Sequence, residues 1–243
     1  MPNLRIDFLS LFPQLLDGVV SCSILSRATK SGLIEFGVYN IRDFATDKHK
    51  ITDDRPFGGG AGMVMKAEPI CSAIDKFRTE TSIVIYMCPD GKLLTSALAK
   101  ELSQKKHLIL LSGHYEGIDE RVRKSRVNLE ISIGDYIITN GTLASAVLAD
   151  AVCRYVPGVL GNANSLTQDS FSNGLLSFPQ YTRPVKFEEI SVPEVLLSGN
   201  HIEINRWRLR QMIEKTELRR PDIFRKWLNS DKKHLEGNKD LQK

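Results

Sequence analysis

The chain has 243 residues, of which 42% are apolar and 26% charged, so its composition is that of a folded globular protein and excludes a disordered or a fibrous one. Its length suits a main domain with a smaller second domain. The formal net charge of +4 belongs to the end of the chain, because residues 201–243 hold 12 Lys and Arg against 7 Asp and Glu, whereas residues 1–200 hold 21 against 22.

The first predicted element is a strand at residues 4–11, where apolar residues first alternate and then run on. Proline is favoured at the first position of a helix, so Pro13 predicts that a helix follows the strand. Arg5 and Asp7 interrupt the opening apolar run, which excludes a secretory signal, and no later stretch reaches the length of a membrane span. We therefore expect a cytoplasmic protein with no membrane contact.

Strands and helices continue to alternate along the chain to residue 155. The further predicted strands are residues 33–41, 82–87, 107–111 and 127–133. The further predicted helices are residues 67–77, 94–103, 118–124 and 142–155. Because the strands are apolar on both faces, this alternation predicts an α/β domain around a largely parallel sheet.

The pattern changes after residue 160. Residues 161–173 are rich in Gly, Asn, Ser, Thr and Asp and lack periodic apolar residues, which predicts a flexible interdomain linker. We expect a first domain over residues 1–160, this linker, and a helical basic domain over residues 174–243.

In the last domain, Pro193 predicts the start of one helix, and Asn200 with Glu203 resembles the cap of another. The apolar residues expected to face a small core there are Ile202, Leu209 and Ile213. The surplus of basic residues in this region suits a polyanionic partner, although a solvated helix face would account for the same charges.

The cysteines predict neither a disulfide nor a metal site. They are far apart and lie in apolar contexts, so we expect reduced, buried thiols at Cys22, Cys71, Cys88 and Cys153. No histidine stands at a metal-ligand spacing from a cysteine or another histidine, and we expect no zinc.

Three predicted strands end in loops that contain glycine, at residues 88–91, 113–117 and 134–141. Each loop by itself can be a tight turn, but ligands of open α/β sheets bind at the carboxyl ends of strands, and the three together favour one pocket. The signatures of dinucleotide and triphosphate loops are absent from the sequence, so the pocket needs another ligand. A further glycine-rich run, residues 55–62, is either a flexible surface segment or a place where a base or a backbone approaches closely.

Several segments, in order and with their spacing kept, closely resemble the TrmD family of tRNA (guanine-N1)-methyltransferases from about residue 4 to residue 228. They are residues 47–50, 53–62, 115–121, 132–136, 156–161 and 181–184. The resemblance implies a SPOUT-type α/β fold, in which a parallel sheet ends in a deep trefoil knot, with a small helical C-terminal domain. It implies methyl transfer from S-adenosylmethionine to N1 of the guanosine immediately 3′ of the anticodon.

The same resemblance assigns residues to this activity. Those implied to bind S-adenosylmethionine are Tyr86, Gly113, Tyr115, Glu116, Ile133, Gly134, Asp135, Tyr136, Ile137, Ile138 and Gly141. Those implied to contact tRNA are Gly58, Gly59, Ser170, Phe171, Arg183, Arg208, Arg219 and Arg220. The resemblance also implies a homodimer whose active site lies at the subunit interface, and it allows for Mg²⁺, for which the residues themselves give no ligand pattern.

Two residues match the family's catalytic positions, Asp169 as general base and Arg154 as the stabiliser of charge on guanine O6. Guanine N1 is a poor nucleophile until it loses its proton, so a carboxylate within hydrogen-bond reach can activate it. A guanidinium can stabilise the charge that then spreads to O6. Without the resemblance, Asp169 would be read as a solvated or capping residue, Arg154 as a partner of the helix dipole, Glu116 as a solvated loop acid and Phe171 as an anchor of the linker.

The chain departs from the family pattern mainly at the third loop. The departures are His114 for arginine, Asn140 for glycine, Thr142 for glutamate, Ala144 and Ser145 for proline and alanine, and Gln180 for histidine. Asn140 can adopt a left-handed conformation, so we expect the loop to survive.

Two other functions fit part of the sequence. A ribose 2′-O-methyltransferase of the same superfamily would share the knot but would not need Asp169. A non-catalytic RNA-binding protein would use the basic domain alone and would not bind S-adenosylmethionine.

Overall fold

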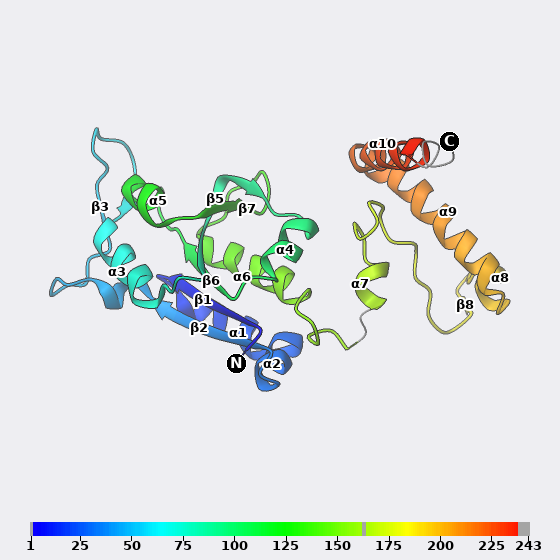
Figure 1. Cartoon of the computed structure of the whole chain (residues 1–243), viewed down its shortest axis with the longest axis horizontal. Helices are drawn as coiled ribbons and strands as arrows, with labels where there is room; N and C mark the ends of the chain where they lie inside the picture. Colours follow the sequence, from blue (N-terminus) through cyan, green and yellow to red (C-terminus); the bar gives the residue numbers. More distant parts are fainter. Residues whose placement is uncertain (1, 162–163, 238–243) are drawn as a thin grey trace. The chain divides into compact units, whose positions relative to one another are not determined.

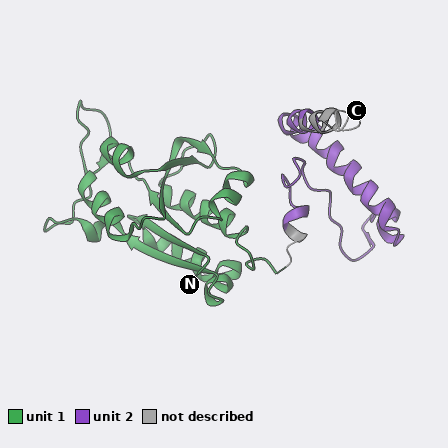
Figure 2. Cartoon of the chain, in the orientation of Figure 1, with its two compact units in different colours: residues 1–161 green, residues 162–243 purple. Residues whose placement is uncertain are grey.

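The computed structural model describes residues 2–161 and 164–237. The chain divides into two compact units, residues 1–161 and residues 162–243 (Figure 2). Residues 162 and 163 of the predicted linker, and residues 238–243 of the predicted basic domain, lie outside the described part.

The first unit is built on one sheet of five parallel strands in the order β2-β1-β6-β5-β7 (Figure 1). The strands are β1 (Leu4–Ser10), β2 (Ile34–Asn40), β5 (Ser82–Leu93), β6 (His107–Ser112) and β7 (Leu129–Ser132). The prediction of an α/β fold around a parallel sheet is therefore confirmed. All carboxyl ends meet at one edge of the sheet, and this edge positions the site described below.

Helices cover both faces of this sheet. The first face carries η1 (Pro13–Leu16), α1 (Asp17–Ser21), α2 (Ser23–Lys30), α4 (Ser96–Leu102) and α6 (Gly141–Cys153). The second face carries η2 (Ile41–Phe44), α3 (Ala67–Phe77) and α5 (Glu120–Arg126). In β6, Leu108 and Leu110 pack on the first face and Ile109 and Leu111 on the second, because successive side chains of a strand point to opposite sides.

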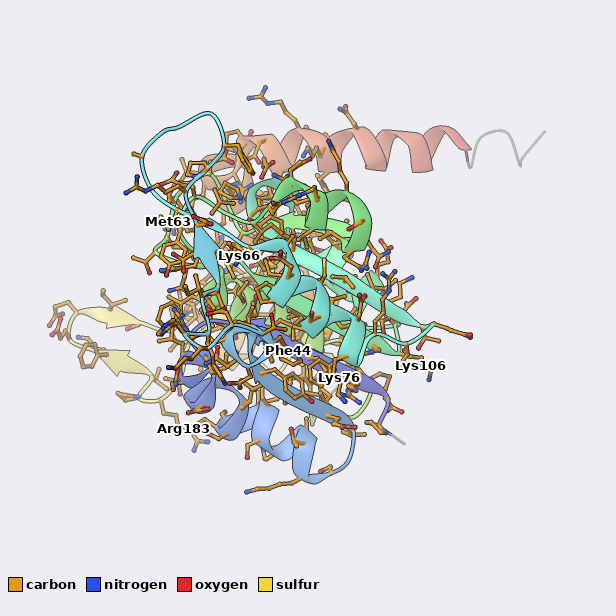
Figure 3. The ribbon with its side chains drawn as sticks, turned by 90° about the vertical axis from the view of Figure 1, so that its left-hand side faces the viewer. Phe44, Met63, Lys66, Lys76, Lys106 and Arg183 are labelled. Carbon is orange, nitrogen blue, oxygen red and sulfur yellow. The ribbon has the colours of Figure 1, made fainter. Side chains whose placement is uncertain are left out.

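A short hairpin, β3 (Asp53–Asp54) with β4 (Val64–Met65), carries the glycine-rich loop. Its second strand is fixed to the segment after β6, because the Met65 N–H donates to Gly117 O over 2.9 Å and the Glu116 N–H donates to Met63 O over 3.0 Å. Figure 3 labels Met63 and Lys66 on this returning arm. The base of the loop is therefore held beside the carboxyl end of β6.

The second unit contains α7 (Asn164–Gln168), β8 (Lys186–Phe187), β9 (Ile190–Ser191), α8 (Glu194–Leu197), α9 (His201–Arg219) and α10 (Pro221–Gly237). Its small core consists of Leu175, Phe178 and Met212, with Ile213, Phe224 and Trp227 packed against it. The segment predicted as a linker thus contains a short helix, and the chain that follows it contributes Leu175 to the core.

The start of α9 follows the sequence pattern, because Asn200 Oδ1 accepts from the N–H groups of Ile202 and Glu203. The predicted core stripe on α9 is wrong at two positions, since Ile202 is 67% exposed and Leu209 49%. The buried residues of the helix are Ile204, Met212 and Thr216. Arg208, which lies between them on that face, covers the Phe178 ring with its guanidinium 4.6 Å from the ring centroid.

The cysteines are free, as expected, but Cys22 is exposed and Cys71 half-buried, so the prediction of burial is correct only for Cys88 and Cys153. In the part of the chain that the structure describes, no helix combines the length and the apolar character needed to cross a membrane.

Candidate functional site

A pocket of about 430 Å³ lies at the carboxyl ends of β5, β6 and β7. Its walls are residues 86–90, residues 113–118, residues 131–134 and residues 136–141, with Arg123 and Ala144. The three glycine-containing loops therefore meet around one cavity. Ten of the eleven residues expected to bind the methyl donor line it, and Asp135 does not.

Sequence reasoning missed several lining residues. Met87, Cys88, Pro89 and Asp90 follow the first part of β5, in a loop that was noted without assigning any of its residues to the site. Arg123 lies on α5 and gave no signal in the sequence, because only the packing of α5 against the sheet brings it to the cavity.

Glycine is needed where two of the loops touch. The Gly141 N–H donates to Gly113 O over 2.7 Å, and a Cβ at Gly141 would lie 2.8 Å from Gly113 N. A Cβ at Gly113 would in turn lie 2.9 Å from the hydroxyl oxygen of Tyr86. Burial raises the pKa of that hydroxyl to about 12, so Tyr86 is a neutral wall of the pocket at physiological pH.

The altered third loop is held by a different interaction from the one expected. Asn140 is extended, with φ −163°, so the expectation of a left-handed residue is wrong. Its Oδ1 instead caps α6 by accepting from the Thr142 N–H over 3.0 Å. The Thr142 hydroxyl is hydrogen-bonded to the Ser10 hydroxyl over 2.7 Å, which ties the start of α6 to the end of β1.

His114 lies between the rings of Phe12 and Tyr115, with centroids 5.0 and 4.3 Å away. Its Nδ1 is buried and has no hydrogen-bond partner among the described residues. A buried nitrogen without a partner is costly, so this wall of the pocket offers a polar atom to a ligand.

A charged cluster stands at the lip of the same pocket. Arg123 donates to Asp90 over 2.6 Å and to both oxygens of Glu130 over 2.8 and 2.7 Å. The Arg123 hydrogen bond holds the pKa of Asp90 below its usual value. Burial, followed by the neighbouring Asp90, raises the pKa of the Cys88 thiol to about 12.

Cys88, Asp90 and Glu130 place one ligand atom each within 4.8 Å of one another, which is close enough for a metal ion. This donor set does not fit Mg²⁺. The thiol is a soft ligand that stays protonated, and the guanidinium of Arg123 already binds both carboxylates.

The glycine-rich loop exposes its tip. Phe57 is fully exposed, and Gly58 and Gly59 have φ values of 84° and 82°, in the region that favours glycine. At the foot of the loop, a Cβ on Gly62 would lie 2.5 Å from Glu116 Oε1. The carboxylate of Glu116 is thus next to the loop as well as to the pocket.

The two predicted catalytic residues lie in different units. Arg154 is the C-cap of α6 in the first unit and is half-buried. Asp169 follows α7 in the second unit and is also half-buried, and its backbone oxygen accepts from the Ser172 hydroxyl over 2.8 Å.

The predicted tRNA contacts of the second unit are mostly at its surface. Phe171 is 45% exposed with φ 75°, and the Ser170 hydroxyl binds that of Ser177 over 3.1 Å. Arg183, Arg219 and Arg220 are exposed, and Arg220 pairs with Asp222 over 2.7 Å. Arg208 is half-buried over Phe178, as described above.

A second polar cluster has the residue types of a hydrolytic triad but not the setting of one. His107 binds Asp7 over 2.9 Å and Ser82 over 2.7 Å, and Arg5 pairs with Asp7 over 2.9 Å. Asp7, Ser82 and His107 are buried near the amino ends of β1, β5 and β6, at the opposite edge from the pocket. Their hydrogen bonds pair polar groups in the interior, so the cluster stabilises the fold.

Comparison with known proteins identifies close relatives. The family model described as tRNA (Guanine-1)-methyltransferase TrmD matches residues 4–226. A tRNA (guanine-N(1)-)-methyltransferase of Dictyoglomus turgidum is 52% identical over 92% of this chain and 91% of its own length. Enzymes with the same name from Staphylococcus haemolyticus and Geotalea uraniireducens are 48% and 52% identical, over 97% and 91% of this chain and 100% and 90% of their own.

Proposed function

The chain belongs to the TrmD family of tRNA (guanine-1)-methyltransferases, and from this premise we propose how its residues divide the work of methyl transfer. It is a tRNA (guanine-N1)-methyltransferase, with S-adenosylmethionine as methyl donor. We infer that the acceptor is the guanosine immediately 3′ of the anticodon and that the enzyme works in the cytoplasm, where its tRNA substrate is. The observation that carries this assignment is the family match over residues 4–226 together with a pocket at the matching loops.

The pocket suits the methyl donor. Its volume of about 430 Å³ is in the range of small-molecule sites, and its lining includes apolar side chains such as Ile131, Ile133 and Ile138 beside the glycines of the loops. When bound, S-adenosylmethionine supplies the methyl group from its sulfonium. The residues of the chain would orient the donor and exclude water, and Tyr86, Ile133 and Ile138 are the ones proposed to bury its apolar parts.

We propose Asp169 as the general base and Arg154 as the residue that stabilises charge on the base. The Asp169 carboxylate would accept the proton from guanine N1, and the nitrogen lone pair would then attack the methyl carbon in line. The Arg154 guanidinium would lie at O6, where negative charge develops. Both residues lie within residues 4–226, the range that the family model matches, and this range supports the proposal.

The substrate tRNA would be bound by Gly58, Gly59, Ser170, Phe171, Arg183, Arg208, Arg219 and Arg220. An anticodon-loop base must leave its stack before its edge is reachable, and the exposed rings of Phe57 and Phe171 are able to stack on it. Exposed arginines of the second unit would neutralise phosphates. The knot of the family is proposed for the segment between β7 and α6, which crosses β5 so that Gly141 binds Gly113.

We propose that two copies of the chain associate through an outer patch formed by Phe12, Leu15, Leu143 and Val147. Leu143 and Val147 lie one turn apart on α6, which is otherwise largely buried, and Phe12 and Leu15 belong to the neighbouring η1 region. All four side chains are between 37% and 49% exposed. Exposed apolar side chains on a helix beside the active pocket and on the η1 region that contacts it suit a second copy that completes the site.

Val147→Glu is expected to convert the dimer to a monomer and to abolish activity, because a twofold interface receives the new charge twice. Sedimentation velocity and methyl transfer would be measured together, with Ile51→Glu, which also replaces an exposed apolar residue, as the control. A Val147→Glu protein that still sediments as a dimer would contradict the proposed interface.

The function is tested by incubating the purified protein with methyl-labelled S-adenosylmethionine and tRNAs that differ only at the guanosine 3′ of the anticodon. Label is expected at N1 of that guanosine and nowhere else. Label on a ribose oxygen would point to the 2′-O class, and the absence of donor binding would point to a non-catalytic RNA-binding protein.

A further inference from the structure

The wall of the pocket formed by β5 is an excursion from the sheet. Met87 and Lys92 both stand opposite Ile131 of β7, so the four residues between them, 88–91, leave the strand register and return to it. A Cβ on Gly91 would lie 2.5 Å from Ile131 N, which shows how closely the returning end lies against β7. The middle of the excursion, with Cys88, Pro89 and Asp90, lines the pocket.

One side chain ties this excursion to the rest of the sheet. Arg123 of α5 donates through Nη2 to Asp90 Oδ2 over 2.6 Å and to Glu130 Oε2 over 2.7 Å, while its Nε donates to Glu130 Oε1 over 2.8 Å. Glu130 is on β7, and Asp90 is on the excursion. The planar guanidinium therefore joins three elements, α5, β5 and β7, with the fork geometry that suits carboxylates.

The same guanidinium also lies against a ring that lines the pocket. Its Cζ is 5.6 Å from the centroid of the Tyr86 ring, within the range of a cation–π contact. The Tyr86 hydroxyl stands close to Gly113, because a Cβ at Gly113 would lie 2.9 Å from it. Arg123 thus helps to hold one of the rings that the donor would contact.

Removing the guanidinium would do more than delete a contact. Carboxylate oxygens of Asp90 and Glu130 lie within 4.8 Å of each other. Without the guanidinium, two negative charges would face one another at that separation. Glu130 is held in a paired strand, whereas Asp90 is on the excursion and its side chain is 62% exposed. Repulsion would therefore displace the excursion, and with it the wall of the pocket.

We propose that Arg123 is a positioning residue for the methyl donor, because it clamps Asp90 to Glu130 and so sets the wall of the pocket at residues 88–91. The identity of the ligand rests on the proposed function. Arg123 acts through the loop and the Tyr86 ring, so it determines donor affinity and not the chemical step.

An electrostatic role would leave a different signature. The cluster of Arg123, Asp90 and Glu130 carries one net negative charge, and loss of Arg123 would make it more negative and would favour a cation. S-adenosylmethionine carries a positive sulfonium, whereas S-adenosylhomocysteine, the product, has a neutral sulfur. A clamp that positions the wall affects both ligands equally, but a direct field effect changes their ratio.

The test is calorimetric titration of the full-length protein with each ligand separately, without tRNA. Arg123→Gln is expected to weaken both ligands by about tenfold, the equivalent of one charge-assisted hydrogen bond. In steady-state assays the KM for the donor should rise by the same factor with kcat unchanged. Arg126→Gln is the matched control, because Arg126 is on the same helix but pairs with Asp75 away from the pocket.

Asp90→Asn separates the clamp from a general loss of stability. Asp90→Asn is expected to weaken binding less than Arg123→Gln. The double variant should bind no worse than Arg123→Gln alone, because both substitutions remove the same contact, the one between Arg123 and Asp90. Titrations should be made well below the unfolding temperatures of all variants.

Wild-type affinity in Arg123→Gln, losses that multiply in the double variant, or a changed ratio of the two ligands would each overturn the clamp. If the wild type binds neither ligand, the proposed function itself fails. If the wild type binds both ligands and Arg123→Gln binds each of them as tightly as the wild type, only the proposed role of Arg123 is wrong.

Discussion

Asp169→Asn is expected to lower kcat for methyl transfer by about a thousandfold, in the middle of the range for loss of a general base. The substitution keeps the size of the side chain and removes the group proposed to accept the N1 proton. Guanine N1 would then keep that proton and lack the lone pair that attacks the methyl carbon. The rate would be measured in single turnover, with the donor and the tRNA both in excess of their dissociation constants.

The affinity of Asp169→Asn for S-adenosylmethionine should equal that of the wild type, because the donor pocket is built from residues 86–144. Glu189→Gln is a suitable control, since Glu189 is a nearly fully exposed acid of the same unit that pairs with Lys186 over 3.2 Å. Raising the pH provides a further check. Because a larger fraction of the guanine has then lost its N1 proton to solvent, the difference in rate between Asp169→Asn and the wild type should decrease. Activity of Asp169→Asn near the wild-type level would remove Asp169 from the mechanism.

Gly141→Ala is expected to weaken binding of S-adenosylmethionine by about five- to a hundredfold, from an overpacking cost of the order of 1–3 kcal/mol. The new Cβ would lie 2.8 Å from Gly113 N and 3.1 Å from Ser112 Cα, and these atoms are backbone and cannot rotate away. Either the 113–117 loop or the start of α6 must move. Both form the wall of the pocket.

The measurement is the dissociation constant of the donor, with the unfolding temperature recorded alongside. Gly18→Ala serves as the control, because a Cβ at Gly18 would meet no atom within 4 Å. A Gly141→Ala protein that binds the donor as tightly as the wild type would mean that the two loops do not form the donor site.

The sequence was sufficient where neighbours along the chain decide the structure. The short apolar run at residues 107–111 favours a strand buried on both faces, and the structure has it in the middle of the parallel sheet. Asn200 caps α9 through N–H groups two and three residues away. The three glycine-containing loops could be predicted for the same reason, since the wide conformational range of glycine is a property of the residue itself.

Helix faces and caps were less predictable, because they depend on what packs against them. On α9, the charged residue Arg208 lies on the inner face and covers the Phe178 ring. A prediction based on apolar residues therefore placed Ile202 and Leu209 in the core, although both are exposed. Asn140 was expected to be left-handed, but the start of α6 against Gly113 makes it an extended cap.

What the sequence by itself determined was the class of fold, the three loops that meet at one pocket and, through its motifs, the family. Only the tertiary structure decided which strand lies beside which, that β5 leaves its register at residues 88–91, and that Arg123 reaches Asp90, 33 residues earlier in the chain. The physical reason is range. Backbone preference and apolar periodicity are properties of a few consecutive residues, whereas a salt-bridge network at a pocket exists only after the sheet has brought distant segments together.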